Sequence, residues 1–170
     1  MDQEENKELV WKACNGSAIR IFYEAARNYV QFLKDNVIDE SSAPELIEML
    51  IDLYSQGSKL PRDEDVHRIK RPILEPPMQW AGNHTIRFRY SPIYYGCLNP
   101  FHDEICNRQL SLSADLGNIA EDLMAGIKEY EKEKSNKALK MWRDGWRLHW
   151  GQHAVAAIRV LHWMITEHGF

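Results

Sequence analysis

Two histidines near the carboxyl end of the chain have a spacing that suits joint chemistry. The stretch "WRDGWRLHWGQHAVAAIRVLH" (residues 142–162) places His149 and His153 four positions apart. On a helix this spacing puts both imidazoles on one face, one turn apart. There they can ligate one metal ion or exchange protons near neutral pH. Either chemistry needs further groups, because two histidines alone do not complete a metal site.

Carboxylates that can partner these histidines lie in the preceding helical segment. Asp115 and Asp122 belong to a polar stripe that borders an apolar one. The short connection to the next segment favours an antiparallel pair of helices. We therefore expect the acidic edge to meet the two histidines in a polar pocket with an aromatic wall. The candidate metal ligands are His149, His153, Asp115 and Asp122.

Four interpretations of this junction stay open. It is a metal site, an acid–base site in which a carboxylate tunes a histidine, an aromatic-walled ligand or peptide pocket, or core packing among hydrogen-bonded rings. Trp150 stands where the hydrolytic H-E-x-x-H signature has glutamate, and no G-x-S-x-G motif occurs. The sequence therefore assigns no enzymatic reaction. The candidate ligand-binding residues are Asp115, Asp122, Trp146, His149, Trp150, His153, Arg159 and His162.

The elements that must position these residues are helices. Apolar residues recur at three- and four-residue steps in four segments, which predict helices at about 5–37, 43–56, 113–134 and 136–168. The last is apolar on most sides, as is typical of a central helix. The sequence thus predicts one all-α domain over residues 1–170, a bundle of four main helices.

A proline-rich segment separates the second predicted helix from the third. Six of the seven prolines fall between residues 61 and 100, which excludes a long helix there. We predict an irregular insert over 58–112, with an alternating pattern at "TIRFRY" (85–90) that suits a short strand or ribbon. Its aromatic residues indicate that it packs across the bundle.

Composition and charge exclude several classes of protein. The chain is 44% hydrophobic and 27% charged, which argues against disorder. A net charge of −4 argues against nucleic acid and anionic membranes as partners. Three widely spaced cysteines without a C-x-x-C pair suit a reducing compartment. The acidic start and the lack of an apolar run of about 18 residues predict a cytoplasmic protein without a membrane span.

The stretches "SLSADLGNIAEDLMAGI" and "WRDGWRLHWGQHAVAAIRVLH" resemble a family of small bacterial all-helical proteins classed as a domain of unknown function. The family pattern reads S-L-x-D-D-L-x-D-I-Y-x-D-L-K, then W-x-x-x-F-x-x-H-W-G-x-H-x-x-x-A-L-R-x-x-H. The resemblance covers roughly residues 111–162 and implies a bacterial helical protein with no established activity. The matching motif residues are Asp115, Asp122, His149, Trp150, Gly151, His153, Ala157, Arg159 and His162.

This chain departs from the family pattern most visibly at three positions. Ala114 and Asn118 stand where the pattern has aspartates, and Ala120 stands where it has tyrosine. The loss of two carboxylates and a phenol weakens a metal or acid–base interpretation for this member.

We therefore expect a non-enzymatic binding module of the bacterial cytoplasm, with an unidentified small molecule or protein as partner and no cofactor. The alternative is an acid–base enzyme, or one dependent on a divalent metal, at the histidine–aspartate junction. A helical partner or immunity-type protein is a third interpretation and requires an exposed apolar patch. His153→Gln separates the first two, because glutamine keeps a hydrogen bond but would cost a metal site its ion.

Overall fold

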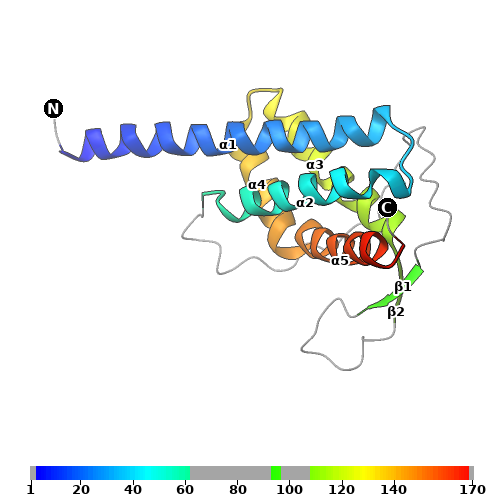
Figure 1. The fold of residues 1–170 in the computed structure, drawn as a ribbon. Coiled ribbons are helices and arrows are strands. Elements are labelled where there is room, and N and C mark those ends of the chain that lie inside the picture. The colour runs from blue at the N-terminus through cyan, green and yellow to red at the C-terminus, as the bar shows by residue number, and fades with distance from the viewer. Residues whose placement is uncertain (1–2, 62–92, 97–107, 169–170) are drawn as a thin grey trace.

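The computed structural model describes residues 3–61, 93–96 and 108–168 (Figure 1). Helices dominate this part of the chain, which confirms the all-α class. A small antiparallel hairpin precedes the third helix. The elements are α1 (Gln3–Asp35), the 3₁₀ turn η1 (Glu40–Ser42), α2 (Ala43–Ser58), β1 (Ile93–Gly96), β2 (Arg108–Ser111), α3 (Leu112–Tyr130), α4 (Ser135–Leu148) and α5 (Trp150–His168).

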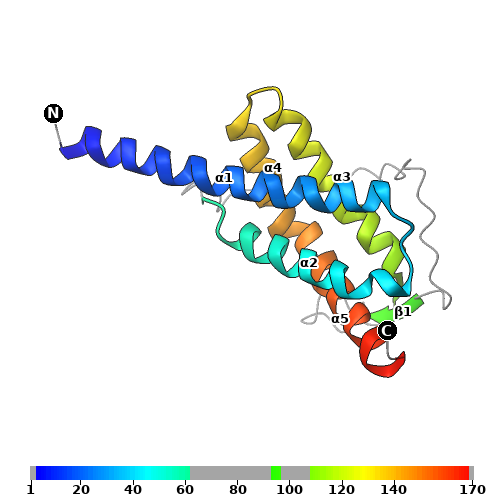
Figure 2. The same cartoon turned by 45° about the horizontal axis from the view of Figure 1, so that its top comes forward.

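The helices pack as two groups. α1 and α2 run antiparallel, and α3 crosses behind them with α4 as a second antiparallel pair (Figure 2). α5 packs against both α2 and α3, so it joins the two groups. None of the described helices is long and apolar enough to cross a membrane.

The predicted helix at 136–168 is two helices, so the prediction of one continuous helix is wrong. α4 ends at Leu148 and α5 begins at Trp150, because His149 has φ −144° and ψ −86°, outside the helical region. Gly151 permits this break: a β-carbon there would lie 2.1 Å from the carbonyl oxygen of Trp146. Only glycine lets the first turn of α5 approach the last turn of α4 so closely.

The predicted helix at 113–134 ends four residues earlier than expected, at Tyr130. A turn follows in which Glu133 has φ 61°, and Lys134 donates its backbone N–H to the carbonyl of Glu129. This short turn reverses the chain into α4. The antiparallel packing expected from the short connection is therefore confirmed.

The described part of the predicted insert is more ordered than expected. β1 pairs antiparallel with β2, and Tyr94 lies opposite Leu110. Half-buried Tyr94 packs against the hydrophobic core, as the aromatic content of the insert predicted. The "TIRFRY" segment (85–90) lies outside the described residues.

A core rich in aromatic rings fills the centre of the bundle. Trp142 and Trp150 are fully buried, and the ring of Phe22 lies 5.1 Å and 5.8 Å from their ring centroids. Trp142 also presses on Gly126 of α3, where a β-carbon would lie 2.0 Å from the indole nitrogen. We call Trp142, Trp150, Phe22 and Gly126 the tryptophan core.

Candidate functional site

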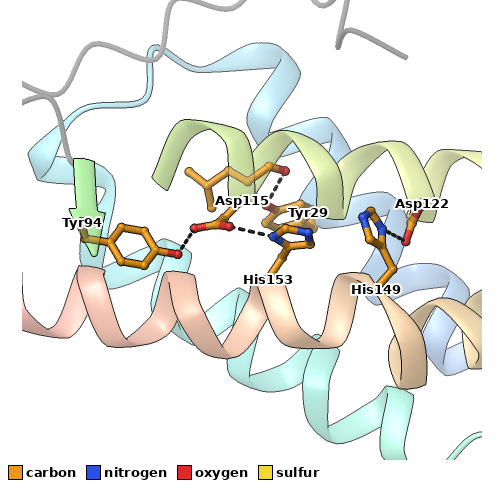
Figure 3. Close-up of polar contacts among 7 residues, drawn as sticks. Tyr29, Tyr94, Asp115, Asp122, His149 and His153 are labelled. Carbon is orange, nitrogen blue, oxygen red and sulfur yellow. Dashed lines mark hydrogen bonds and ion pairs between the residues drawn. The ribbon is translucent and has the colours of Figure 1, made fainter. Parts of the chain in front are cut away.

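The start of α5 turns two histidines toward α3 (Figure 3). Nδ1 of His149 lies 2.8 Å from Oδ2 of Asp122, and Nδ1 of His153 lies 2.7 Å from Oδ1 of Asp115. Asp115, the earlier aspartate, pairs with His153, the later histidine, and Asp122 pairs with His149. This order is the one expected for two antiparallel helices. The structure thus brings together the four residues that the sequence proposed as metal ligands. We call them the histidine–aspartate seam.

Both imidazoles are held through the same ring atom. A carboxylate only accepts hydrogen bonds, so each Nδ1 carries the proton and donates it. Nε2 of each ring is then the remaining functional atom, and it makes no hydrogen bond with any described residue. The rings stand next to each other between the two aspartates, with centroids 4.8 Å apart and planes at 80° (Figure 3).

The pair at the amino-terminal end of α3 is buried and extended by a third residue. Asp115 is only 2% exposed, and its second oxygen accepts a 2.5 Å hydrogen bond from the hydroxyl of Tyr94 on β1. Burial and this carboxylate raise the pKa of Tyr94, which keeps the phenol a neutral donor. The guanidinium of Arg159 lies 5.6 Å from the Tyr94 ring centroid.

Behind this chain lies a second buried phenol. The hydroxyl of Tyr29 on α1 donates to the carbonyl of Leu116 at 3.1 Å, which anchors α3 directly beside Asp115 (Figure 3). Burial raises the pKa of Tyr29 well above its usual value, and the Asp115 charge adds to the effect. Residues of α1, α3, α5 and the hairpin thus hold Asp115 and His153 in place.

The other pair is more open to solvent. The side chains of His149 and Asp122 are 23% and 30% exposed. The hydrogen bond that His149 donates to Asp122 raises the pKa of His149; burial opposes this, while the charges of Asp122 and Glu121 add to it. Burial raises the pKa of Glu121, and the Asp122 charge contributes further. His149 therefore holds its second proton to a higher pH than an isolated histidine.

The two tryptophans among the predicted ligand-binding residues pack within the bundle. Trp150 is fully buried, and its indole nitrogen donates to the carbonyl of Trp142 at 3.0 Å. Trp146 is half-buried against Tyr54, with ring centroids 5.4 Å apart. Its indole nitrogen is buried and has no hydrogen-bond partner among the described residues. Neither indole contacts the histidine–aspartate seam through a hydrogen bond.

The two downstream candidates separate from the paired histidines. His162 is exposed and lies about half a turn around α5 from His153, since nine residues span 2.5 turns. Arg159 is also exposed, yet it reaches the seam indirectly through the Tyr94 ring. The structure therefore brings Arg159, but not His162, near the predicted site.

The sequence did not indicate Tyr94 and Tyr29 as site residues. Tyr94 stood out only as one aromatic residue of the insert, and Tyr29 only as an apolar position of the first helix. No local pattern links either residue to Asp115, because these contacts span 21 residues for Tyr94 and need the tertiary packing of α1 for Tyr29.

The described residues hold no metal-binding cluster of the usual size. Within 3–61, 93–96 and 108–168, no group of three or more histidine, cysteine, aspartate or glutamate side chains is arranged to hold an ion. Of the positions that depart from the family pattern, Ala114 is exposed and Asn118 is half-buried. Asn118 follows Asp115 by three residues and precedes Asp122 by four, so its amide shares their face of α3.

Comparisons with other proteins agree with the motif resemblance. Residues 94–167 match the model of a family described as a domain of unknown function (DUF5063). This range includes Tyr94 and all four residues of the histidine–aspartate seam. The crystal structure of protein BF1032 from Bacteroides fragilis matches with a TM-score of 0.58 and 21% identity, over 83% of this chain and 90% of that one. It shares the fold. No curated protein matches the chain.

Proposed function

We propose that this chain is a ligand-binding module whose ligand contacts Nε2 of His149 and of His153. One observation carries the proposal: each ring is bound through Nδ1 by a carboxylate of α3, and Nε2 has no hydrogen-bond partner among the described residues. The two rings are adjacent, with their centroids 4.8 Å apart. A ligand that uses both would be bound by groups already fixed in orientation, which lowers the entropic cost of binding.

The cost of the buried pair supports a role beyond stability. Asp115 is almost wholly removed from water, and a buried carboxylate costs free energy unless hydrogen bonds compensate for its lost hydration. Among the described residues, the hydrogen bonds from Tyr94 and His153 help to offset the loss of hydration of the carboxylate. Such an arrangement fixes the orientation of His153, which matters for a ring that must present Nε2 to a ligand.

Packing explains the tryptophans better than it explains the histidines. Trp142 and Trp150 are fully buried, and each indole N–H donates to a backbone carbonyl. The side chains of His149 and His153 keep 23% and 13% exposure, and each ring retains one unpaired nitrogen within the described part of the chain. The indole N–H groups of Trp142 and Trp150 are therefore satisfied within the fold, whereas His149 and His153 each keep one ring nitrogen without a described partner.

An acid–base enzyme is the second candidate, and the hydrogen-bonded chain Tyr94–Asp115–His153 favours it. A carboxylate on Nδ1 holds an imidazole in the tautomer whose Nε2 can take up a proton. However, no serine, threonine or cysteine hydrogen-bonds to either ring among the described residues. Binding therefore ranks above catalysis.

The proposal is tested by following the histidine ring nitrogens during titration. Chain labelled with ¹⁵N is mixed, in separate samples, with divalent cations, carboxylic acids, phosphate esters and short peptides, while side-chain nitrogen spectra are recorded. We expect at least one titrant to perturb Nε2 of both His149 and His153. His149→Gln and His153→Gln should abolish the response, whereas His162→Gln on the exposed side of α5 should retain it.

Two results would contradict the proposal. Either no titrant perturbs these rings, or the perturbation persists unchanged in both glutamine variants. A titrant that binds and is recovered chemically altered would favour the enzyme instead.

A further inference from the structure

We infer that Tyr94 is a positioning residue for His153, through which docking of the β1–β2 hairpin onto α3 and α5 controls how this ring presents Nε2. The inference rests on the proposed function and describes the regulation of its site. The two side chains act on each other through one shared carboxylate. Oδ1 of Asp115 lies 2.7 Å from Nδ1 of His153, and Oδ2 accepts the 2.5 Å hydrogen bond from the Tyr94 hydroxyl.

Tyr94 connects the hairpin to both helices of the seam. Its hydroxyl donates to Asp115 on α3, and the guanidinium of Arg159 on α5 lies 5.6 Å from its ring centroid (Figure 3). Burial, and then the hydrogen bond and charge of Asp115, raise the pKa of Tyr94, while the charge of Arg159 opposes this. The phenol therefore stays a neutral donor, and the hairpin meets the seam through a residue that both helices contact.

Asp115 has little freedom to absorb a change at either oxygen. It is 2% exposed, so water cannot readily replace a lost donor. Its helix is anchored at the next residue, because the hydroxyl of Tyr29 on α1 donates to the carbonyl of Leu116 at 3.1 Å. Linked hydrogen bonds polarise one another in a low-dielectric interior. Loss of the Tyr94 hydroxyl should therefore be expressed at Nδ1 of His153.

The neighbouring His149–Asp122 pair has the same kind of bond without this connection. Nδ1 of His149 lies 2.8 Å from Oδ2 of Asp122. The side chain of Asp122 is 30% exposed, against 2% for Asp115, so water can satisfy its carboxylate. The described residues of the hairpin make no hydrogen bond to this pair. It is therefore an internal comparison, one turn away on α5, for the effect that the hairpin has on His153.

The connection through Asp115 acts in both directions, because a coupling free energy is reciprocal. With the hairpin docked, Tyr94 holds the Asp115 carboxylate, which in turn holds His153 with its proton on Nδ1. With the hairpin undocked, the carboxylate loses one of its two donors and the ring loses its fixed orientation. A ligand that needs Nε2 of His153 in place therefore binds the docked form more tightly and holds the hairpin on the bundle.

The first test follows His153 in the ¹⁵N-labelled chain without any titrant, at one fixed alkaline pH. Long-range proton–nitrogen correlations report which ring nitrogen carries the proton. In Tyr94→Phe we expect the Nδ1 signal of His153 to shift and a fraction protonated on Nε2 to appear, while the His149 signals in the same spectrum move less. Tyr23→Phe is the matched control, because it removes a hydroxyl that donates to an exposed carboxylate, that of Glu131, at 3.2 Å. It should leave the His153 signals unchanged.

The second test reads the opposite direction, by amide hydrogen exchange across β1 and β2. His153→Leu removes the donor to Asp115, so exchange in the hairpin should become about 10- to 100-fold faster, as expected for one lost hydrogen bond to a charged group. His153→Gln keeps a donor and should retain the protection. His149→Leu, one turn earlier, is the control and should leave hairpin exchange unchanged. Circular dichroism of each variant checks that the helices persist.

A purely structural role for Tyr94 predicts a different result, namely lower stability in Tyr94→Phe with unchanged His153 signals. That result would overturn the inference, and so would equal hairpin exchange in His153→Leu and His149→Leu. If His153→Leu does not fold, the first test still decides.

Failure of this inference is distinguishable from failure of the proposed function, because both tests use the free chain. If titrants perturb both histidine rings but Tyr94→Phe leaves His153 unchanged, the binding function stands and the coupling is wrong. If Tyr94→Phe changes His153 but no titrant perturbs either ring, the coupling stands and the binding function is wrong. If both hold, a titrant that perturbs the rings should bind Tyr94→Phe more weakly than the unsubstituted chain.

Discussion

Residues 142–162 contribute to two regions of the molecule, the tryptophan core and the histidine–aspartate seam, which differ in how their polar groups are used. In the core, the indole N–H of Trp142 donates to the carbonyl of Leu123 at 3.1 Å, and that of Trp150 donates to Trp142. In the seam, His149 and His153 each use one ring nitrogen and keep the other free of described partners.

The difference shows how one stretch of chain can serve stability and binding at once. The core satisfies its polar atoms internally and buries its rings fully, so nothing in it is available to a ligand. In the seam, carboxylates fix both rings through Nδ1, and Nε2 of each ring has no hydrogen-bond partner in the part of the chain that the structure describes. The break at His149 separates the two tasks, since it lets α5 leave α4 in a new direction while Trp150 stays in the core.

The largest expected effect is on the core. Trp142→Ala should lower the free energy of unfolding by about 3–5 kcal/mol, because it leaves a cavity between Phe22 and Gly126. Urea unfolding followed by circular dichroism measures the change. Val155→Ala, on the exposed face of α5, is the control and should change stability by less than about 0.5 kcal/mol. Similar losses in both variants would mean that Trp142 is not a core residue.

A glycine substitution tests the close packing around Trp142 by adding a methyl group and removing no side chain. Gly126→Ala should destabilise the fold by about 1–3 kcal/mol, because the added β-carbon would lie 2.0 Å from the Trp142 indole nitrogen. Gly16→Ala is the matched control, since nothing lies within 4 Å of its β-carbon position in α1. It should stabilise the helix by about 0.5–1 kcal/mol. Thermal melts that shift in the same direction would contradict the close contact.

Within the seam, substitutions at the buried Asp115–His153 pair should lower stability more than substitutions at the exposed His149–Asp122 pair. Tyr94→Phe removes the hydroxyl that donates to buried Asp115, which should cost about 1–3 kcal/mol of stability. Tyr54→Phe is the control, because the Tyr54 hydroxyl has no hydrogen bond among the described residues. Chemical denaturation that finds no difference between the two variants would show that Tyr94 does not hold the hairpin to α3.

The smallest expected effect is the pH dependence of the stability that the exposed His149–Asp122 pair contributes. The pKa of His149 is raised above 6.5 in the folded chain by Asp122 and Glu121, with His153 as its neighbour on α5. The pair therefore contributes stability that is fully present below pH 6.5 and is lost as the pH rises through the folded pKa. Solvent exposure limits this contribution to about 1 kcal/mol or less.

The free energy of unfolding of the unsubstituted chain and of the Asp122→Asn variant, both free of metal, is measured by urea unfolding across about pH 5 to 9. The stability difference should be largest at the acidic end of this range and should shrink toward the alkaline end. A difference that grows with pH would contradict the direction of the His149 shift.

The sequence indicated the seam more accurately than it indicated the course of the helices. The helical periodicity of the apolar residues and the short connecting loop were sufficient to predict that α3 pairs antiparallel with the helical segment that follows it. That pairing in turn predicted that Asp115 and Asp122 meet the two histidines. The break at His149 was missed because Trp146 before it and Trp150 and His153 after it keep helical spacing across it. Gly151 permits the break, because a β-carbon there would lie 2.1 Å from the Trp146 carbonyl oxygen, and this close approach exists only once the chain has folded.

Contacts between distant segments could not be predicted for the same reason. Tyr94 reaches Asp115 from a strand beyond a proline-rich segment, and Tyr29 reaches Leu116 from α1. Neither contact follows from periodicity, because periodicity describes one element at a time. The tryptophans were predicted to line a pocket, yet burial in the core accounts for Trp150 and partial burial against Tyr54 accounts for Trp146.

The most direct test of the account is the protonation of each histidine ring, read from long-range proton–nitrogen correlation spectra of the ¹⁵N-labelled, metal-free chain at alkaline pH. The account predicts that His149 and His153 both carry their single proton on Nδ1 and leave Nε2 unprotonated, with exposed His162 as the reference. A proton on Nε2 of either ring would contradict the central claim, because that ring would then not be held by its aspartate with Nε2 left free for a ligand.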